Sequence, residues 1–170
     1  NGNLTFTTLS LSSIGMGNVA AYQIRDAQWG DFDNDGYLDL YVVRINGSSN
    51  APNVLFLNNG NGTFRDGTAQ FNAAGATGGR GDGFAIADFD RNGFLDFLLA
   101  NGLDGTRGSY QLFRNTGNSN HWLRVIPTNS SGSPEFGSKV WLAAGGTWQL
   151  REYGDNNGQK ASQEPILHFG

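Results

Sequence analysis

The strongest constraint on the fold is an internal repeat of the sequence. Residues 27–40 reappear as residues 84–97, and residues 55–60 return as residues 112–117 with the same offset of 57. The first six residues match a third block with an offset of 58. A repeat of this length is typical of propellers, solenoids and other arrays, because such units bury their hydrophobic faces only against one another.

Each unit has the pattern of short β-strands. Residues 38–43 and 53–57 are rich in β-branched and aromatic side chains, and Asn-Gly pairs suited to tight hairpin turns recur along the chain. A unit of about four short strands has the size of one propeller blade. With 26 Gly residues and only 15% charged residues, a helical bundle is excluded. We therefore predict an all-β fold with two propeller-type blades whose calcium loops are flanked by strands.

The character of the sequence changes near residue 118, after which the acidic loops stop. Residues 122–126, 139–142 and 147–153 have the composition of strands, and we expect Trp122, Trp141 and Trp148 to be buried in their core. The predicted domains are two repeats at residues 1–118, divided into about 1–57 and 58–118, and a small β module at residues 119–170.

Two acidic segments at matched repeat positions fit the pattern D-x-[D/N]-x-[D/N]-G-x-x-D. Oxygen donors at alternating positions can point inward when a chain curls around an ion, and many hard oxygens suit Ca²⁺ better than Mg²⁺. The Gly of the motif allows the sharp turn, and the residue after it can offer a backbone carbonyl. The predicted calcium ligands are Asp31, Asp33, Asp35, Tyr37 and Asp39 in loop 1, and Asp88, Asp90, Asn92, Phe94 and Asp96 in loop 2. Because loop 1 has one more carboxylate, we expect it to bind Ca²⁺ more tightly.

An EF-hand is the obvious alternative for these loops. It requires a Glu at loop position 12 and flanking helices. Position 12 is Val42 in loop 1 and Leu99 in loop 2, and both lie in predicted strands. A second alternative, that the acidic strings are solvated turns, is disfavoured because the motif occurs twice at matched positions.

Composition excludes several classes of function. There is no Cys, so disulfides, thiolate metal sites and Cys catalysis are absent. The net charge of −4 and the lack of a Lys/Arg cluster disfavour nucleic acid as a partner. No run approaches the roughly 20 apolar residues of a membrane span. Because the Asp residues have the spacing of a cation loop, we predict no catalytic residues and no enzyme activity.

The two loops and the hairpin at residues 58–64 resemble FG-GAP/VCBS repeats, and the tail resembles the ASPIC/UnbV module that follows such repeats in cartilage-acidic-protein-like chains. The tail resemblance rests on residues 120–125, 137–140, 144–146, 151–152, 162–163 and 167–170. This resemblance implies calcium binding at the loop positions, a secreted or cell-surface location, and a structural or adhesive role.

Two blades without a closed ring leave sheet edges open, and open edges invite pairing with other chains. We predict an extracellular structural protein that assembles head-to-tail into an oligomer or filament, through its sheet edges and an N-terminal strand at residues 4–11. The alternative is a calcium-dependent adhesion or carbohydrate-binding module within a larger propeller protein. Glycosylation is permitted at the sequons of Asn3, Asn46, Asn61 and Asn129.

Overall fold

The computed structural model describes residues 5–46, 49–75, 81–102, 108–154, 162–163 and 166–170. These residues form an all-β structure whose helical content is two short 3₁₀ turns, η1 (Ser12–Ile14) and η2 (Gly17–Ala21). The all-β prediction is therefore confirmed. No helix in the described part of the chain is long and apolar enough to cross a membrane.

The first sheet contains five strands. They are β1 (Gln23–Gly30), β2 (Asp39–Asn46), β3 (Ser49–Asn50), β4 (Val54–Asn58) and β5 (Phe64–Asp66). The order is β1-β2-β4-β5, with β3 added to β2, and all pairings are antiparallel. The connection between β1 and β2 is acidic loop 1.

The second sheet has the same hairpin plan. It is built from β6 (Gly81–Ala87), β7 (Asp96–Asn101) and β8 (Gln111–Phe113), with β12 (Ser162–Gln163) added in parallel to β6. The connection between β6 and β7 is acidic loop 2. Gly30 pairs with Asp39, and Ala87 pairs with Asp96, so the two loops leave their hairpins at matching register positions.

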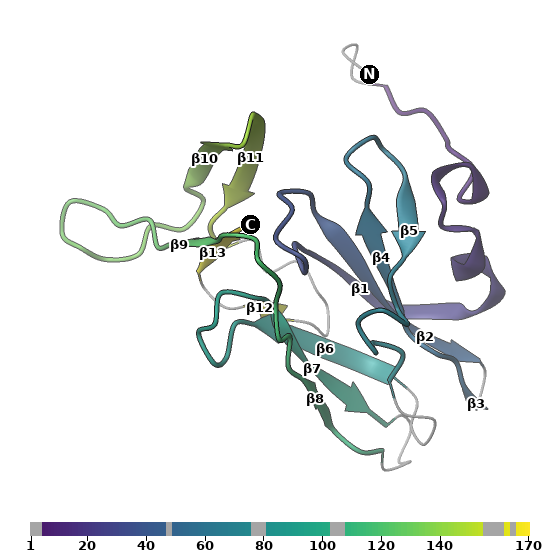
Figure 1. The fold of residues 1–170 in the computed structure, drawn as a ribbon. Helices are drawn as coiled ribbons and strands as arrows, with labels where there is room; N and C mark the ends of the chain where they lie inside the picture. The colour runs from purple at the N-terminus through teal and green to yellow at the C-terminus, as the bar shows by residue number, and fades with distance from the viewer. Residues whose placement is uncertain (1–4, 47–48, 76–80, 103–107, 155–161, 164–165) are drawn as a thin grey trace.

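The remaining strands belong to the C-terminal segment. The strands β10 (Lys139–Ala144) and β11 (Thr147–Glu152) form a hairpin, and β9 (Leu123–Val125) pairs antiparallel with β13 (Leu167–Phe169). Figure 1 shows these C-terminal strands on one side of the two larger sheets. Their own core contains Tyr153, Leu167 and Phe169.

One hydrophobic core joins the two larger sheets. It is formed by Tyr41, Val43 and Leu55 of the first sheet with Phe84, Phe97 and Leu99 of the second, among others. The rings of Tyr41 and Phe97 lie 4.5 Å apart between centroids, and Phe97 stacks on Phe113 at 4.4 Å. The opposite face of the first sheet is covered by Met16 and Val19 of the η2 region. The sheets thus bury their apolar faces against one another, as repeat units must.

One expectation about the fold is untested and one is wrong. Residues 5–11 of the expected N-terminal strand form no strand within this chain, and Phe6 is fully exposed; their pairing with the sheet of a neighbouring chain stays a prediction. The tryptophans predicted to be buried are instead exposed, by 43% for Trp122, 62% for Trp141 and 70% for Trp148. The hairpin of β10 and β11 has only one covered face, so the side chains on its other face meet solvent.

Other expectations stay predictions. The domain boundaries near residues 57 and 118 are not tested by the sheet arrangement. Among the sequons, Asn61 and Asn129 are exposed, whereas Asn3 and the side chain of Asn46 lie outside the described residues. Most of the Gly-rich segment at residues 75–83 also lies outside them, and β6 begins at its residue Gly81.

Candidate metal centres

Loop 1 brings three carboxylates together at the end of β1 and the start of β2. The ligand atoms of Asp31, Asp33 and Asp39 lie within 4.8 Å of one another. Asp31 and Asp39 are almost completely buried. Asp31 accepts hydrogen bonds from the backbone N–H groups of Asp35 and Gly36, both at 3.1 Å. These bonds curl the loop around the carboxylates.

Loop 2 repeats this arrangement with Asp88, Asp90 and Asp96, whose ligand atoms also lie within 4.8 Å of one another. Asp88 accepts a hydrogen bond from the N–H of Gly93 at 3.1 Å. The backbone conformations match as well, with φ angles of 90° at Gly36 and 88° at Gly93. A positive φ explains why Gly occupies this motif position in both loops.

The last Asp of each motif ties the loop to a distant hairpin. Asp39 accepts hydrogen bonds from the N–H groups of Phe32, at 2.9 Å, and of Asn58, at 2.8 Å. In the second repeat, Asp96 accepts hydrogen bonds from Phe89 at 3.0 Å and Asn115 at 2.7 Å. In each repeat the accepting carboxylate therefore lies in the first repeated block, residues 27–40 or 84–97. One of its N–H donors lies in the second repeated block, residues 55–60 or 112–117.

The other predicted ligands lie outside the carboxylate triads. Asp35 is exposed and accepts a hydrogen bond from the N–H of Tyr37 at 2.9 Å. In loop 2, the Oδ1 atom of Asn92 accepts a hydrogen bond from the N–H of Phe94 at 2.8 Å. The carbonyl groups proposed as ligands at Tyr37 and Phe94 remain predictions.

Burial works against the ionised state of four of the Asp carboxylates in the two loops. Burial raises the pKa of Asp31 to about 6 against the opposing effect of Arg151, and burial raises the pKa of Asp39 to about 8. Burial also raises the pKa values of Asp33 and Asp96. In addition, the Oδ1 atom of Asp33 is buried and has no hydrogen-bond partner in the described part of the chain. Crowded, buried carboxylates with an unused oxygen fit a hard dication, which would satisfy both the charge and the open acceptor.

Each loop is approached by two arginines. Arg65 lies 3.4 Å from Asp33 and Arg114 lies 2.5 Å from Asp90, and both guanidinium groups are largely exposed. The other two come from the C-terminal strands and are mostly buried. They are Arg151, at 3.9 Å from Asp31, and Arg124, at 3.5 Å from Asp88. Exposed ion pairs contribute little stability. The two buried arginines, Arg124 and Arg151, therefore make the stronger electrostatic link between the C-terminal strands and the loops.

The C-terminal segment packs directly on both loops. Gly93 is the central contact, because its carbonyl oxygen accepts hydrogen bonds from Asn34 Nδ2 and His168 Nε2, both at 2.9 Å. The indole of Trp122 covers the position where a Cβ at Gly93 would lie, only 1.8 Å from its Nε1 atom. Burial lowers the pKa of His168, and a neutral ring with its proton on Nε2 suits this bond.

Loop 1 has its own contacts to the later part of the chain. The Nδ2 atoms of Asn118 and Asn120 donate hydrogen bonds to the carbonyl oxygen of Asp33 at 2.6 and 3.0 Å. A Cβ at Gly170 would lie 2.5 Å from an oxygen of Asp31. Sequence reasoning missed all of these contacts. The only signal was the tail resemblance, which includes Asn120, Arg124, Arg151 and His168 without giving them a role.

The family comparison agrees with this architecture. Residues 31–99, which contain both loops, match the family model of the FG-GAP-like repeat. The resemblance inferred from the acidic loops is thereby confirmed.

Three similar proteins are all cartilage acidic protein 1. The mouse protein (Mus musculus) is 34% identical over 82% of this chain and 22% of its own length. The human protein (Homo sapiens) is 32% identical over 86% of this chain and 23% of its own length. The frog protein (Xenopus tropicalis) is 30% identical over 100% of this chain and 26% of its own length, so the similarity includes the C-terminal segment. The chain spans about a quarter of the length of these relatives.

The relatives also bear on location. They are named for cartilage, which agrees with the secreted or cell-surface location that the resemblance implied.

A substitution at Gly93 tests the packing of the C-terminal segment on loop 2. Gly93→Ala places a methyl group against Trp122 and also forces an L-residue into positive φ. Gly132→Ala is the matched control, because Gly132 has a φ of 80° but open space around it. We expect Gly132→Ala to lower the free energy of unfolding by about 1–2 kcal/mol and Gly93→Ala to lower it by clearly more. Urea unfolding measures both. Equal losses would contradict the packing role of Gly93.

The raised pKa values predict how the metal-free protein responds to pH. Asp31 and Asp39 have higher pKa values in the folded state than the ordinary value of 3.8, so the folded state binds more protons than the unfolded state between about pH 4 and pH 8. The stability that protonation provides is fully present below about pH 4 and is lost as pH rises through 6 and 8. In chelator, we expect the contribution of these residues to fall over this range. Thermal melting of the wild type and of Asp39→Asn isolates the contribution of Asp39. The melting temperature of the variant should depend less on pH than that of the wild type, and an identical pH dependence would refute the raised pKa of Asp39.

Proposed function

We propose that the protein is a calcium-binding extracellular structural protein, in which two Ca²⁺ ions hold the hairpins of two propeller-type blades and their C-terminal module in place. The observation that carries the proposal is the pair of matched carboxylate triads, each with ligand atoms within 4.8 Å. The buried, unpaired Oδ1 of Asp33 is independent support for an ion in loop 1. The FG-GAP-like match across both loops supports the same function.

Each ion would act as a crosslink rather than as a catalyst. Asp31 and Asp39 stand at the ends of adjacent strands, so an ion held by both would close the mouth of the β1–β2 hairpin. The same holds for Asp88 and Asp96 in the second sheet. Because both loops contact the C-terminal segment, fixing the loops would also fix that segment. The proposal assigns the acidic residues to metal binding and gives the protein no enzyme activity.

Calcium binding is tested by isothermal titration calorimetry and thermal melting. We expect two Ca²⁺ ions per chain and a higher melting temperature with calcium than with chelator, because a ligand that binds only the folded state stabilises it. Asp33→Asn and Asp90→Asn should each remove or strongly weaken one site. Both residues are only partly buried, so these variants should still fold.

Glu135→Gln serves as the control, because it removes an exposed carboxylate far from both triads in sequence. It should leave two sites of unchanged affinity. A folded wild-type protein that shows neither binding heat nor a change in melting temperature would overturn the proposal.

We also propose self-association through the open edge of the second sheet. The strand β8 is the last strand of that sheet, and Leu112 in it pairs with Leu98 of β7. The two side chains are 57% and 44% exposed, so they form an apolar surface beside an open edge. An edge of this kind can pair with a second chain.

Charge at the edge should prevent this association. Leu112→Lys places a charge on β8, and Gln70→Lys places the same charge at an exposed turn of the first sheet as a control. In sedimentation velocity with calcium, the wild type and Gln70→Lys should associate, whereas Leu112→Lys should remain monomeric. A monomeric wild type would exclude the assembly and leave the calcium proposal untouched.

A specific observation favours the alternative of a calcium-dependent adhesion or carbohydrate-binding module. Trp141 pairs with Leu150, and Ala143 pairs with Trp148, so both indoles extend from the same exposed face of the β10–β11 hairpin. Aromatic rings displayed in this way are suited to contact with an amphipathic ligand.

A further inference from the structure

We propose that the two carboxylate triads bind calcium cooperatively, because hydrogen bonds that run directly between the repeats hold both triads in one arrangement. The inference rests on the proposed function, since it takes each triad as a calcium site. It adds that filling one site raises the affinity of the other. The side chains of Asn34 and Asn115 make the connection, and each donates a hydrogen bond to a carbonyl oxygen of the other repeat.

The first connection runs through Asn34 of loop 1. This residue is almost fully buried, and its Nδ2 atom donates a hydrogen bond of 2.9 Å to the carbonyl oxygen of Gly93 in loop 2. The N–H of the same Gly93 donates to the carboxylate of Asp88 in the second triad at 3.1 Å. Because Asn34 directly follows Asp33 of the first triad, one side chain joins the backbone of the first site to the residue that closes the second.

The second connection runs through Asn115, which lies two residues after β8. Its backbone N–H donates to Asp96 of the second triad at 2.7 Å. Its Nδ2 atom donates to the carbonyl oxygen of Phe32 in loop 1, also at 2.7 Å. The N–H of Phe32 in turn donates to Asp39 of the first triad at 2.9 Å. A continuous series of hydrogen bonds therefore links a carboxylate of one triad to a carboxylate of the other.

Each connecting residue has a counterpart at the matched position of the other repeat. Asn34 has a φ of 54°, and Arg91 in loop 2 has a φ of 59°, but the side chain of Arg91 is exposed. Asn115 corresponds to Asn58, whose Nδ2 atom donates to the carbonyl oxygen of Leu38 within the first repeat. Each pair shares its local backbone geometry and differs in the contact across the repeats, so the pairs provide matched variants.

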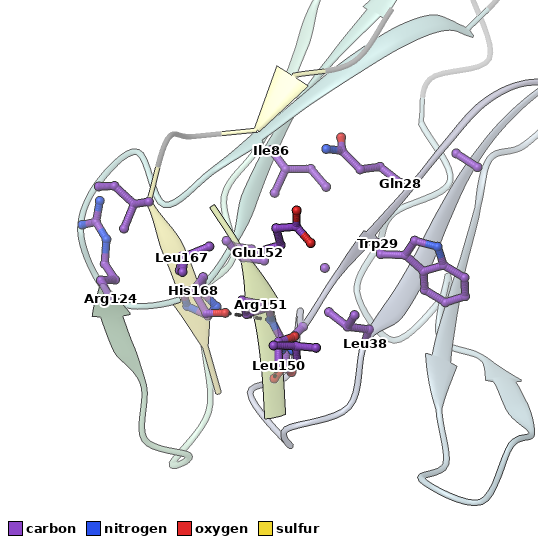
Figure 2. A pocket seen from close by; sticks show the side chains of 15 residues that line it. Gln28, Trp29, Leu38, Ile86, Arg124, Leu150, Arg151, Glu152, Leu167 and His168 are labelled. Atoms are coloured by element: carbon purple, nitrogen blue, oxygen red, sulfur yellow. Dashed lines mark hydrogen bonds and ion pairs between the residues drawn. The ribbon is translucent and has the colours of Figure 1, made fainter. Parts of the chain in front are cut away.

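The C-terminal segment holds the first connection in place. The carbonyl oxygen of Gly93 accepts a second hydrogen bond from His168 Nε2 at 2.9 Å, so both of its lone pairs are used. Arg151 donates a hydrogen bond of 3.1 Å to the carbonyl oxygen of His168 and lies 3.9 Å from Asp31. Both side chains line the pocket between β1, β6 and the C-terminal strands, where Figure 2 shows them side by side.

The hydrogen bonds also give the coupling its sign. Gly93 and Phe32 each donate their N–H to their own triad and accept, at their carbonyl oxygen, a hydrogen bond from the other repeat. When the carboxylates of one triad are fixed on an ion, the backbone that the other repeat contacts is fixed as well. Less conformational entropy is then lost when the second site fills. Repulsion between two dications acts in the opposite direction.

Calorimetric titration of calcium measures the coupling. Asp33→Asn leaves the second site and Asp90→Asn leaves the first, so each variant gives one single-site binding constant. For independent sites, the product of the two stepwise constants of the wild type equals the product of these single-site constants. We expect the wild-type product to be about tenfold larger, which is within the usual range of coupling between sites. Repulsion alone would make it smaller.

Two matched pairs of variants locate the coupling. Asn34→Gly keeps the left-handed backbone and removes the side-chain donor, and Arg91→Gly makes the same change in loop 2. Asn115→Ala removes the bond to Phe32, whereas Asn58→Ala removes a bond within one repeat. With the titrations repeated in each background, Asn34→Gly and Asn115→Ala should each lower the ratio of the two products about threefold. Arg91→Gly and Asn58→Ala should leave this ratio at the wild-type value.

Amide hydrogen exchange gives a readout that does not depend on affinity. In Asp90→Asn, calcium fills the first site alone, yet exchange of the Gly93 N–H in the second loop should slow severalfold. In Asp90→Asn combined with Asn34→Gly, calcium should leave this exchange rate unchanged.

The outcomes separate this inference from the proposed function. A wild-type ratio of one or less, or a ratio that neither Asn34→Gly nor Asn115→Ala changes, would overturn the coupling and leave calcium binding at both triads intact. Exchange at Gly93 that does not respond to calcium in Asp90→Asn would also overturn it. A folded wild type that binds no calcium would overturn both proposals.

Discussion

The structure depends on the last carboxylate of each acidic motif. Asp39 and Asp96 are almost fully buried, yet each is satisfied by two backbone N–H groups from separate segments. A buried carboxylate with such partners fixes the loop, the first strand pair and the following hairpin in one arrangement, because losing either donor would leave a buried charge or acceptor unpaired. This explains why the acidic motif and the Asn-x-Gly hairpin recur with one common offset of 57 residues.

The two repeats then differ in what surrounds the same local structure. In loop 1, four Asp residues are approached by Arg65 and Arg151, whereas in loop 2 three Asp residues are approached by Arg114 and Arg124. Buried guanidinium groups lower the repulsion among carboxylates but cannot occupy the centre of a triad, since they approach only one oxygen edge. Loop 1 has one carboxylate more than loop 2, and the expectation that it binds Ca²⁺ more tightly stays a prediction.

Sequence reasoning succeeded where the information is local. The spacing of Asp and Gly predicted both loops, and strand composition predicted the hairpins on either side of them, because alternation and turn residues are encoded within a few positions. It failed where the outcome depends on partners far along the chain. The exposure of Trp141 and Trp148 depends on which face of the hairpin is covered.

The contacts between the loops and the C-terminal segment were beyond sequence reasoning for the same reason. His168 and Gly93 are 75 positions apart, and Asn120 and Asp33 are 87 positions apart. No periodicity relates such residues, and a single carbonyl oxygen such as that of Gly93 has no signature in the sequence. These contacts nevertheless give the C-terminal segment its role, because it satisfies polar groups that two curled loops expose on the same side.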